Sequence, residues 1–177
     1  MKKNEDGNVV VLFAFLFILF VFCMALVVDV GIIYMQRNEM QDICRMIRED
    51  RFAYENSIKY ADNPAVEYYN HIYDSIQNNN FEGEFTLYYK EKKPESNERS
   101  YKIRIQLKRE YNFTLGKLLG FDSTDIIVHI DGEETFGEKK LDMIWHPKKA
   151  ISTYNGSYTS DGKKQYTYVY NDYPSEW

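Results

Sequence analysis

The chain has 177 residues, a formal net charge of −5 and two cysteines. Its mild acidity argues against the basic surface by which proteins bind nucleic acid, so we expect no DNA or RNA partner. The length outside any membrane segment suffices for one modest domain and excludes a second one of ordinary size.

An uninterrupted apolar run, residues 9–28, follows a short N-terminal segment, residues 1–8. A helix rises about 1.5 Å per residue, so the run matches the roughly 30 Å hydrocarbon core of a bilayer. It lacks the polar stripe of a soluble helix. It is also too long for the apolar region of a signal peptide, and no small-residue cleavage site follows it. The sequence therefore predicts an uncleaved, single transmembrane anchor.

Charge alone gives little information on how this anchor is oriented. Basic residues occur on both sides of the run, namely Lys2, Lys3, Arg37, Arg45 and Arg48. The positive-inside rule slightly favours a cytoplasmic N-terminus and an extracytoplasmic C-terminal domain in the cell membrane.

A helical stalk is predicted for residues 29–77. Apolar residues recur there at helical spacings, at Met40, Ile43, Ile47, Tyr54, Ile58 and Ala61. Asp62-Asn63-Pro64 interrupts this amphipathic stripe, because proline lacks the amide hydrogen and clashes with the preceding turn. A second, shorter helix is expected to begin at that break, with Asp62 or Asn63 as its cap, and to end at residues 78–80.

The apolar period changes from 3.6 to 2 in residues 81–136. Alternation predicts strands at 85–90, 101–113 and 124–130, with a charged loop at 91–100 and a hydrophobic loop at 115–121. One face of the sheet is expected to be buried and the other wet, as is usual for antiparallel sheets. The wet face is assigned to Lys102, Arg104, Gln106 and Lys108. The prediction is a small antiparallel three-stranded meander.

The C-terminal segment, residues 137–177, is rich in tyrosine and lysine. Asn155-Gly156 and Asp161-Gly162 are typical hairpin turns, and residues 165–170 have the composition of a strand. Aliphatic residues are scarce, so a disordered tail is favoured over a loose hairpin, and both remain open. The predicted fold class is α+β.

Motifs that carry catalysis or bind metal are not evident in the sequence. No histidine is near a cysteine or paired at helical spacing, and the loop at 115–121 lacks the pattern of a phosphate-binding loop. Asp131 to Glu134 is interpreted as a polar turn at the end of a strand. We therefore predict no catalytic residue, metal, cofactor or small-molecule substrate.

Asp29 and Cys44 each invite a sharper interpretation. Asp29 follows the apolar run directly, where it either marks the end of the span or contacts a neighbouring helix. Cys23 and Cys44 are too far apart on one helix to bond to each other. Each is expected to be a buried thiol, and the alternative for Cys44 is a pairing with a partner subunit.

The N-terminal pattern resembles a known family. Gly7 precedes the apolar run, Asp29-Val30-Gly31-Ile32-Ile33-Tyr34 closes it and Met40-Gln41 follows. This pattern is similar to the start of the TadE/TadG-like proteins of the Tad (Flp) pilus. A processed pilin would keep a glutamate where this chain has Leu12, so the resemblance implies a permanently anchored component. The candidate assembly and anchor residues are Gly7, Asp29, Gly31, Tyr34, Gln41 and Cys44.

The functional prediction is a membrane-anchored, pseudopilin-like minor component of a Tad/Flp pilus or secretion apparatus, and not an enzyme. Its expected partners are the lipid bilayer and other pilus or platform proteins, which it would meet through the N-terminal helix. One alternative is a generic single-span extracellular binding or adhesion module unrelated to pili. Another is an anchored enzyme whose site would appear as a polar pocket with converging carboxylates or histidines.

Overall fold

The computed structural model describes residues 5–50, 53–92, 99–136, 149–160, 162 and 164–177. The chain forms two compact units. Unit 1 comprises residues 1–36 and 110–126, and unit 2 comprises residues 37–109 and 127–177. Most of the predicted charged loop, and residues 137–148 of the predicted tail, lie outside the described residues.

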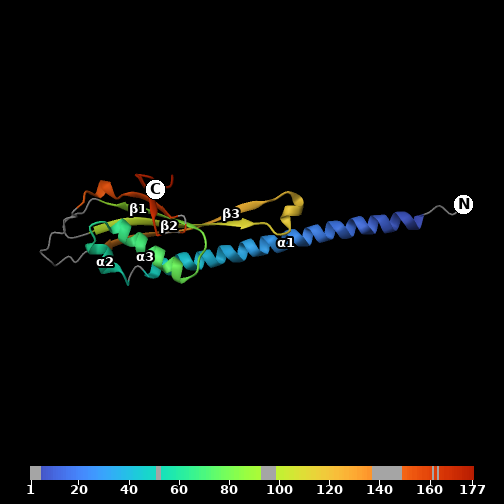
Figure 1. Ribbon diagram of the computed structural model, residues 1–177, viewed down its shortest axis with the longest axis horizontal. Helices are drawn as coiled ribbons and strands as arrows, with labels where there is room; N and C mark the ends of the chain where they lie inside the picture. The colour runs from blue at the N-terminus through green and yellow to red at the C-terminus, as the bar shows by residue number, and fades with distance from the viewer. Residues whose placement is uncertain (1–4, 51–52, 93–98, 137–148, 161, 163) are drawn as a thin grey trace. The chain divides into compact units, whose positions relative to one another are not determined.

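Helix α1 extends from Glu5 to Asp50 and includes the whole predicted anchor (Figure 1). Among the described residues it is the one helix that is long and apolar enough to cross a membrane. Almost all side chains of residues 9–28 are exposed, as expected for a surface that lipid would cover. The predicted long N-terminal helix is therefore confirmed.

The amphipathic stripe beyond the anchor is divided between two helices. Helix α1 ends at Asp50, and the short helix α2 covers Glu55–Tyr60. The predicted apolar positions Met40, Ile43, Ile47 and Ile58 are buried in unit 2, whereas Tyr54 is exposed. The burial pattern therefore follows the predicted stripe although the helix does not continue to Ala61.

Helix α3, Pro64–Asn78, begins at the predicted break. Asn63 is its N-cap, and its side-chain oxygen accepts a hydrogen bond from the Val66 amide at 3.2 Å. Its buried face packs on the sheet, where Tyr69 stacks on Phe85 with ring centroids 4.9 Å apart. Figure 1 shows α3 beside the strands.

The sheet has five antiparallel strands in the order β3-β2-β1-β4-β5, so the predicted three-stranded meander is wrong in strand number. The bounds of the strands are β1 Glu84–Glu91, β2 Arg99–Asn112, β3 Ser123–Phe136, β4 Gly156–Ser160 and β5 Tyr166–Tyr170. Strand β1 lies between β2, with Leu87 opposite Ile105, and β4, with Leu87 opposite Tyr158. The three predicted strands are correct, but β1 is central and not an edge.

For the described part of the C-terminal segment, the favoured disordered tail is also wrong, because β4 and β5 pair as a hairpin that completes the sheet. Strand β4 begins at Gly156, so Asn155-Gly156 is not the turn of this hairpin. Tyr154 and Tyr158 are buried, and the Tyr158 hydroxyl donates to the Tyr154 carbonyl oxygen at 2.6 Å. Tyrosine therefore supplies the core here in place of the aliphatic residues that the segment lacks.

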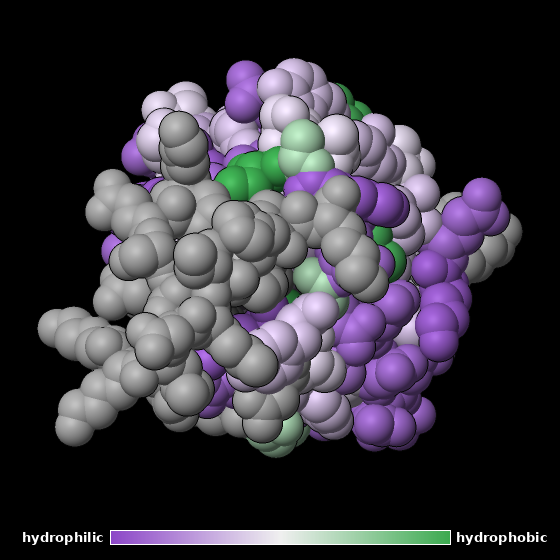
Figure 2. All heavy atoms as spheres, turned by 90° about the vertical axis from the view of Figure 1, so that its left-hand side faces the viewer, coloured by the Kyte–Doolittle hydropathy of each residue, from purple (hydrophilic) through white to green (hydrophobic). Residues whose placement is uncertain are grey.

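Tyrosine rings continue this core around β1. Tyr89 stacks on Tyr101 at 5.2 Å and meets Tyr154 edge-on at 6.2 Å. Such aromatic pairs contribute about 0.5–1.5 kcal/mol beyond their buried area. By contrast, the described residues on the face shown in Figure 2 are mainly hydrophilic, and hydrophobic side chains show among them only in small areas.

Candidate functional site: the Asp29 carboxylate and the β2–β3 loop

Asp29 is fully buried, and both of its carboxylate oxygens are hydrogen bonded. Oδ1 accepts from the Tyr111 hydroxyl at 2.8 Å and from the Thr114 amide at 3.2 Å. Oδ2 accepts from the amides of Leu115 at 3.1 Å and Gly116 at 2.7 Å. Three successive backbone N–H groups thus converge on one anion, and all of these residues belong to unit 1.

The β2–β3 loop, residues 113–121, can surround Asp29 because two glycines allow its tight path. A Cβ on Gly116 would lie 2.9 Å from the Phe113 ring, so a side chain there would displace the ring. A short 3-10 helix, Gly116–Leu119, follows and ends at Gly120, whose φ of 85° is the left-handed conformation that glycine adopts readily. The predicted hydrophobic loop is confirmed as a loop.

The chemistry of this site is that of an anion held in place. A carboxylate with four donors has little capacity left for a substrate or a proton, and buried charge is tolerated when it is hydrogen bonded in this way. The amides of the loop do bind an anion, although the sequence pattern excluded a phosphate loop. Asp29 therefore positions the β2–β3 loop on α1, and its partners are in its own chain rather than on a neighbouring helix.

The other candidate residues do not join this site. Gly7 lies in the first turns of α1, and a Cβ added to Gly31 would have no atom within 4 Å. Tyr34 is exposed, and Gln41 is half-buried in unit 2. Cys44 is a buried free thiol in unit 2, as the plainer expectation had it, whereas Cys23 is exposed on the anchor.

Sequence reasoning does not find the partners of Asp29, namely Tyr111, Thr114, Leu115 and Gly116. Alternation assigns Tyr111 to the buried side of its strand, but this gives no information on which residue it contacts. The hydrogen bonds join residues 82 to 87 positions apart. Short periodicities contain no signal for such a contact, and the one hint in the sequence is a carboxylate at the end of the span together with a glycine-containing apolar loop.

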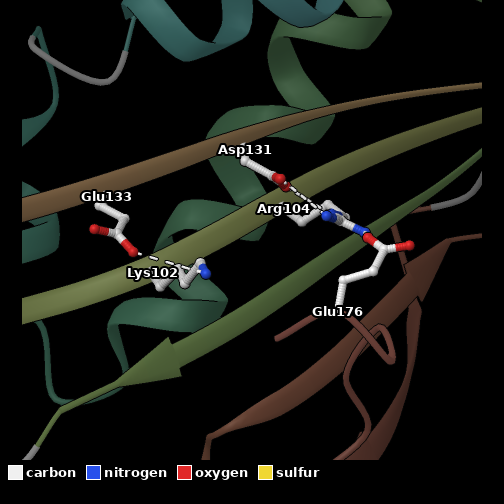
Figure 3. Close-up of polar contacts among 5 residues, drawn as sticks. All are labelled: Lys102, Arg104, Asp131, Glu133 and Glu176. Atoms are coloured by element: carbon white, nitrogen blue, oxygen red, sulfur yellow. Dashed lines mark hydrogen bonds and ion pairs between the residues drawn. The ribbon is translucent and has the colours of Figure 1, made fainter.

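A second polar cluster lies in unit 2, on the face of the sheet that α3 does not cover. This is the face that the sequence predicts to be wet. Arg104 Nε and Nη2 donate to Asp131 Oδ1 and Oδ2 at 2.6 and 2.9 Å, and Nη1 donates to Glu176 at 2.9 Å (Figure 3). The Trp177 ring centroid lies 5.7 Å from the guanidinium. Arg104 is therefore buried under the C-terminal residues, and its prediction as a wet residue is wrong.

The acidic stretch that includes Asp131 is part of β3 and not a turn. The Arg104 guanidinium hydrogen bonds hold the pKa of the Asp131 carboxyl below its usual range. Glu133, two residues further along the same strand, lies 3.7 Å from Lys102 (Figure 3). These carboxylates cross-link neighbouring strands of the sheet.

A groove of about 370 Å³ lies between α3 and β1 in unit 2. Tyr73, Phe81 and Phe85 contribute to its walls, and Glu82 is the one carboxylate among the described residues that line it. This lining does not have the converging carboxylates or histidines that would favour the enzyme alternative.

These features define the class of protein, in which a helix of membrane-spanning length is followed by an α+β domain. Residues 7–44 match the family model described as putative Flp pilus-assembly TadE/G-like. The match confirms the TadE/TadG-like resemblance over this segment, which includes the anchor and Asp29. Neither the search of curated proteins nor the search of solved structures returned a match.

Proposed function

We propose that the protein is a membrane-anchored, non-enzymatic minor component of a Tad/Flp-type pilus or secretion apparatus. Its N-terminus is cytoplasmic and its C-terminal domain extracytoplasmic, and it acts by helix-mediated assembly with other pilus or platform proteins. The family match supports this proposal because it falls on the segment that contains the apolar helix.

One observation carries the proposal: α1 presents a bulky exposed stripe that continues past the end of the apolar run. Val27, Val30 and Tyr34 are 66%, 62% and 66% exposed, and they recur at helical spacings of three and four. At about 100° per residue, Val27 and Tyr34 lie on the side of the helix opposite Asp29, and Val30 lies between that side and Asp29. The described chain covers the Asp29 side with its own loop and leaves this stripe uncovered.

Gly31 lies on the same side of α1 as Val27 and Tyr34. The space around it is open, since a Cβ added there would have no atom within 4 Å. A small residue between large ones leaves room for the backbone of a second helix to approach closely, as it does at the interfaces of membrane helices. The stripe is therefore suited to pack against a helix of another subunit.

The test is photocrosslinking in intact cells that express the pilus genes. A photoreactive residue at Val30 or Tyr34 is expected to capture another pilus or platform protein. The matched control is Tyr60, which is equally exposed but lies on α2. Cys44 is unsuitable as a crosslinking site because it is buried. If Val30 and Tyr34 yield only the monomer, as Tyr60 is expected to do, assembly through this stripe is refuted, and the generic adhesion module becomes the better interpretation.

A further inference from the structure

The β2–β3 loop lies against one side of the last two turns of the apolar run in unit 1. Leu115 lines an apolar groove of about 520 Å³ together with Phe22, Ala25 and Val28 on α1. Ala25 is buried, although almost all other residues of the run are exposed. Asp29 holds the loop there through the amides of residues 114–116.

The depth of the loop follows from the helical rise. Ala25 precedes Val28 by three residues and Phe22 precedes it by six, which corresponds to about 4.5 and 9 Å along the helix axis. If residues 9–28 span the hydrocarbon, which is part of the proposed function, Leu115 lies within the outer part of that layer. Figure 1 shows the loop that joins β2 and β3 against α1.

Irregular backbone is tolerated at this depth only when its polar groups are bonded internally. The loop meets this condition at both ends. The Phe113 amide donates to the Asp122 carbonyl oxygen, and the Phe121 amide to that of Gly116, both at 3.1 Å. Asp29 accepts the three successive amides between them, so the carboxylate removes the main cost of placing this loop beside lipid.

The side chains of the loop suit the boundary between headgroups and acyl chains. Leu115 and Phe121 are 36% and 53% exposed, so nothing in the described chain fully covers them. Lys117 is exposed between them, and a lysine can extend its ammonium from such a position to a lipid phosphate.

We propose that the β2–β3 loop is a second lipid-binding element. It inserts Leu115 and Phe121 into the headgroup–acyl boundary of the leaflet at the Val28 end of the span, and Asp29 is the positioning residue. The occupant of this apolar surface is lipid, because the surface is continuous with the exposed membrane-spanning face of α1.

The test uses the full chain in phosphatidylcholine vesicles that contain lipids with a nitroxide at a shallow or a deep acyl position. An environment-sensitive fluorophore is attached at Phe121→Cys in a Cys23→Ala background, and at Tyr34→Cys as the exposed control six residues beyond Val28. The Cys23→Ala chain without either added cysteine reports labelling of the buried Cys44. We expect the shallow nitroxide to quench the label at 121 about threefold more strongly than the label at 34.

Substitution Asp29→Ala is expected to abolish this difference, because the loop loses its anchor to α1. Asp42→Ala is the control, since Asp42 is an exposed carboxylate on the same helix. Equal quenching at 121 and 34 in the chain that keeps Asp29 overturns the proposal. A second pair of results also overturns it: lipid does not quench the label at 121, and a photoreactive residue at 121 captures another protein in cells. The loop would then dock on protein and not on lipid.

The native Cys23 separates this outcome from failure of the proposed function. A label at Cys23, which is exposed on the apolar run, is expected to be quenched by the deep nitroxide. Quenching at Cys23 without quenching at 121 rejects the loop alone. Absence of quenching at both positions rejects the membrane span itself and the loop insertion that depends on it.

Discussion

At the scale of single residues, two carboxylates of the described chain, Asp29 and Asp131, are hydrogen bonded within their own fold. Asp29 accepts hydrogen bonds from four donors, and Asp131 accepts two from the Arg104 guanidinium, one from Nε and one from Nη2. The residue types and their local positions are visible in the sequence. Their roles are not, because each role depends on a partner in a distant part of the chain.

The Asp131 contact predicts a pH-dependent stability. Because hydrogen bonding lowers the pKa of Asp131 from its usual 3.8, its contribution is present above pH 3.8 and is lost as the pH falls through the lower folded-state value. Asp131→Asn is expected to reduce the free energy of unfolding by about 1 kcal/mol at neutral pH, a figure that allows for its partial exposure. Chemical denaturation in detergent measures the difference, which should vanish in acid.

The control is Glu133→Gln, which removes the longer and more exposed contact with Lys102. Its effect at neutral pH should be within about 0.5 kcal/mol of zero. A difference between Asp131→Asn and the parent chain that persists unchanged in acid would show that the ion pair is not its origin.

Glycine 156 supplies a second prediction at this scale. Its φ is 149°, and a Cβ there would collide with the Val169 carbonyl oxygen of β5. Gly156→Ala is expected to reduce the free energy of unfolding by about 2–4 kcal/mol, from backbone strain and the clash together. Gly162 has a φ of 88°, but a Cβ there would make only an ordinary contact, at 3.8 Å, so Gly162→Ala should cost about 1 kcal/mol. Equal losses in the two variants would contradict the clash.

At the scale of elements, periodicity predicts what depends on neighbours in the chain. The 3.6-residue stripe locates α3, and alternation locates β1, β2 and the start of β3. The order of the strands depends on pairs such as Leu87 with Tyr158, about seventy positions apart, and periodicity does not encode that pairing. The β4–β5 hairpin is not predicted, because scarcity of aliphatic residues ordinarily indicates that a segment has no core. In this hairpin tyrosine side chains form the core instead.

The role of tyrosine in that core can be tested within the hairpin. Tyr158 is almost fully buried on β4, whereas Tyr170 on β5 is 59% exposed. Tyr158→Ala is expected to lower the free energy of unfolding by about 3–5 kcal/mol, and Tyr170→Ala by less than about 1 kcal/mol. Thermal unfolding followed by near-ultraviolet circular dichroism measures both. A small effect of Tyr158→Ala would mean that the hairpin adds little to the stability of the sheet.

At the scale of the whole molecule, the chain combines a segment that matches a family model with a domain that lies outside the match. The searches of curated proteins and of solved structures returned no match. The family model covers residues 7–44, and the sheet lies outside it. Anchor and fold class are predictable because length, hydropathy and periodicity determine them. The division into two units is not predictable in this way, because unit 1 combines the start of α1 with residues 110–126, which are distant from it in the sequence.

The anchor itself gives a prediction for the entire chain. The double substitution Leu16→Arg/Leu19→Arg should cost about 5–7 kcal/mol of insertion free energy, at about 2.5–3.5 kcal/mol for each charge. The variant is expected to leave the carbonate-resistant membrane fraction, while Tyr34→Arg/Met35→Arg, just beyond the run, remains in it. Retention of the first variant would argue that residues 9–28 do not span the bilayer.

The separation of Asp29 from its donors also sets an order of events during synthesis. The carboxylate emerges from the ribosome 82 residues before Tyr111. At about 5–20 residues per second, this corresponds to an interval of roughly 4–16 s. If residues 9–28 span the bilayer, as proposed, an anchor that inserts during that interval does so with the Asp29 carboxylate still hydrated. Closure of the loop then buries the Asp29 carboxylate, and this step cannot occur before β2 and the first residues of the loop have been made.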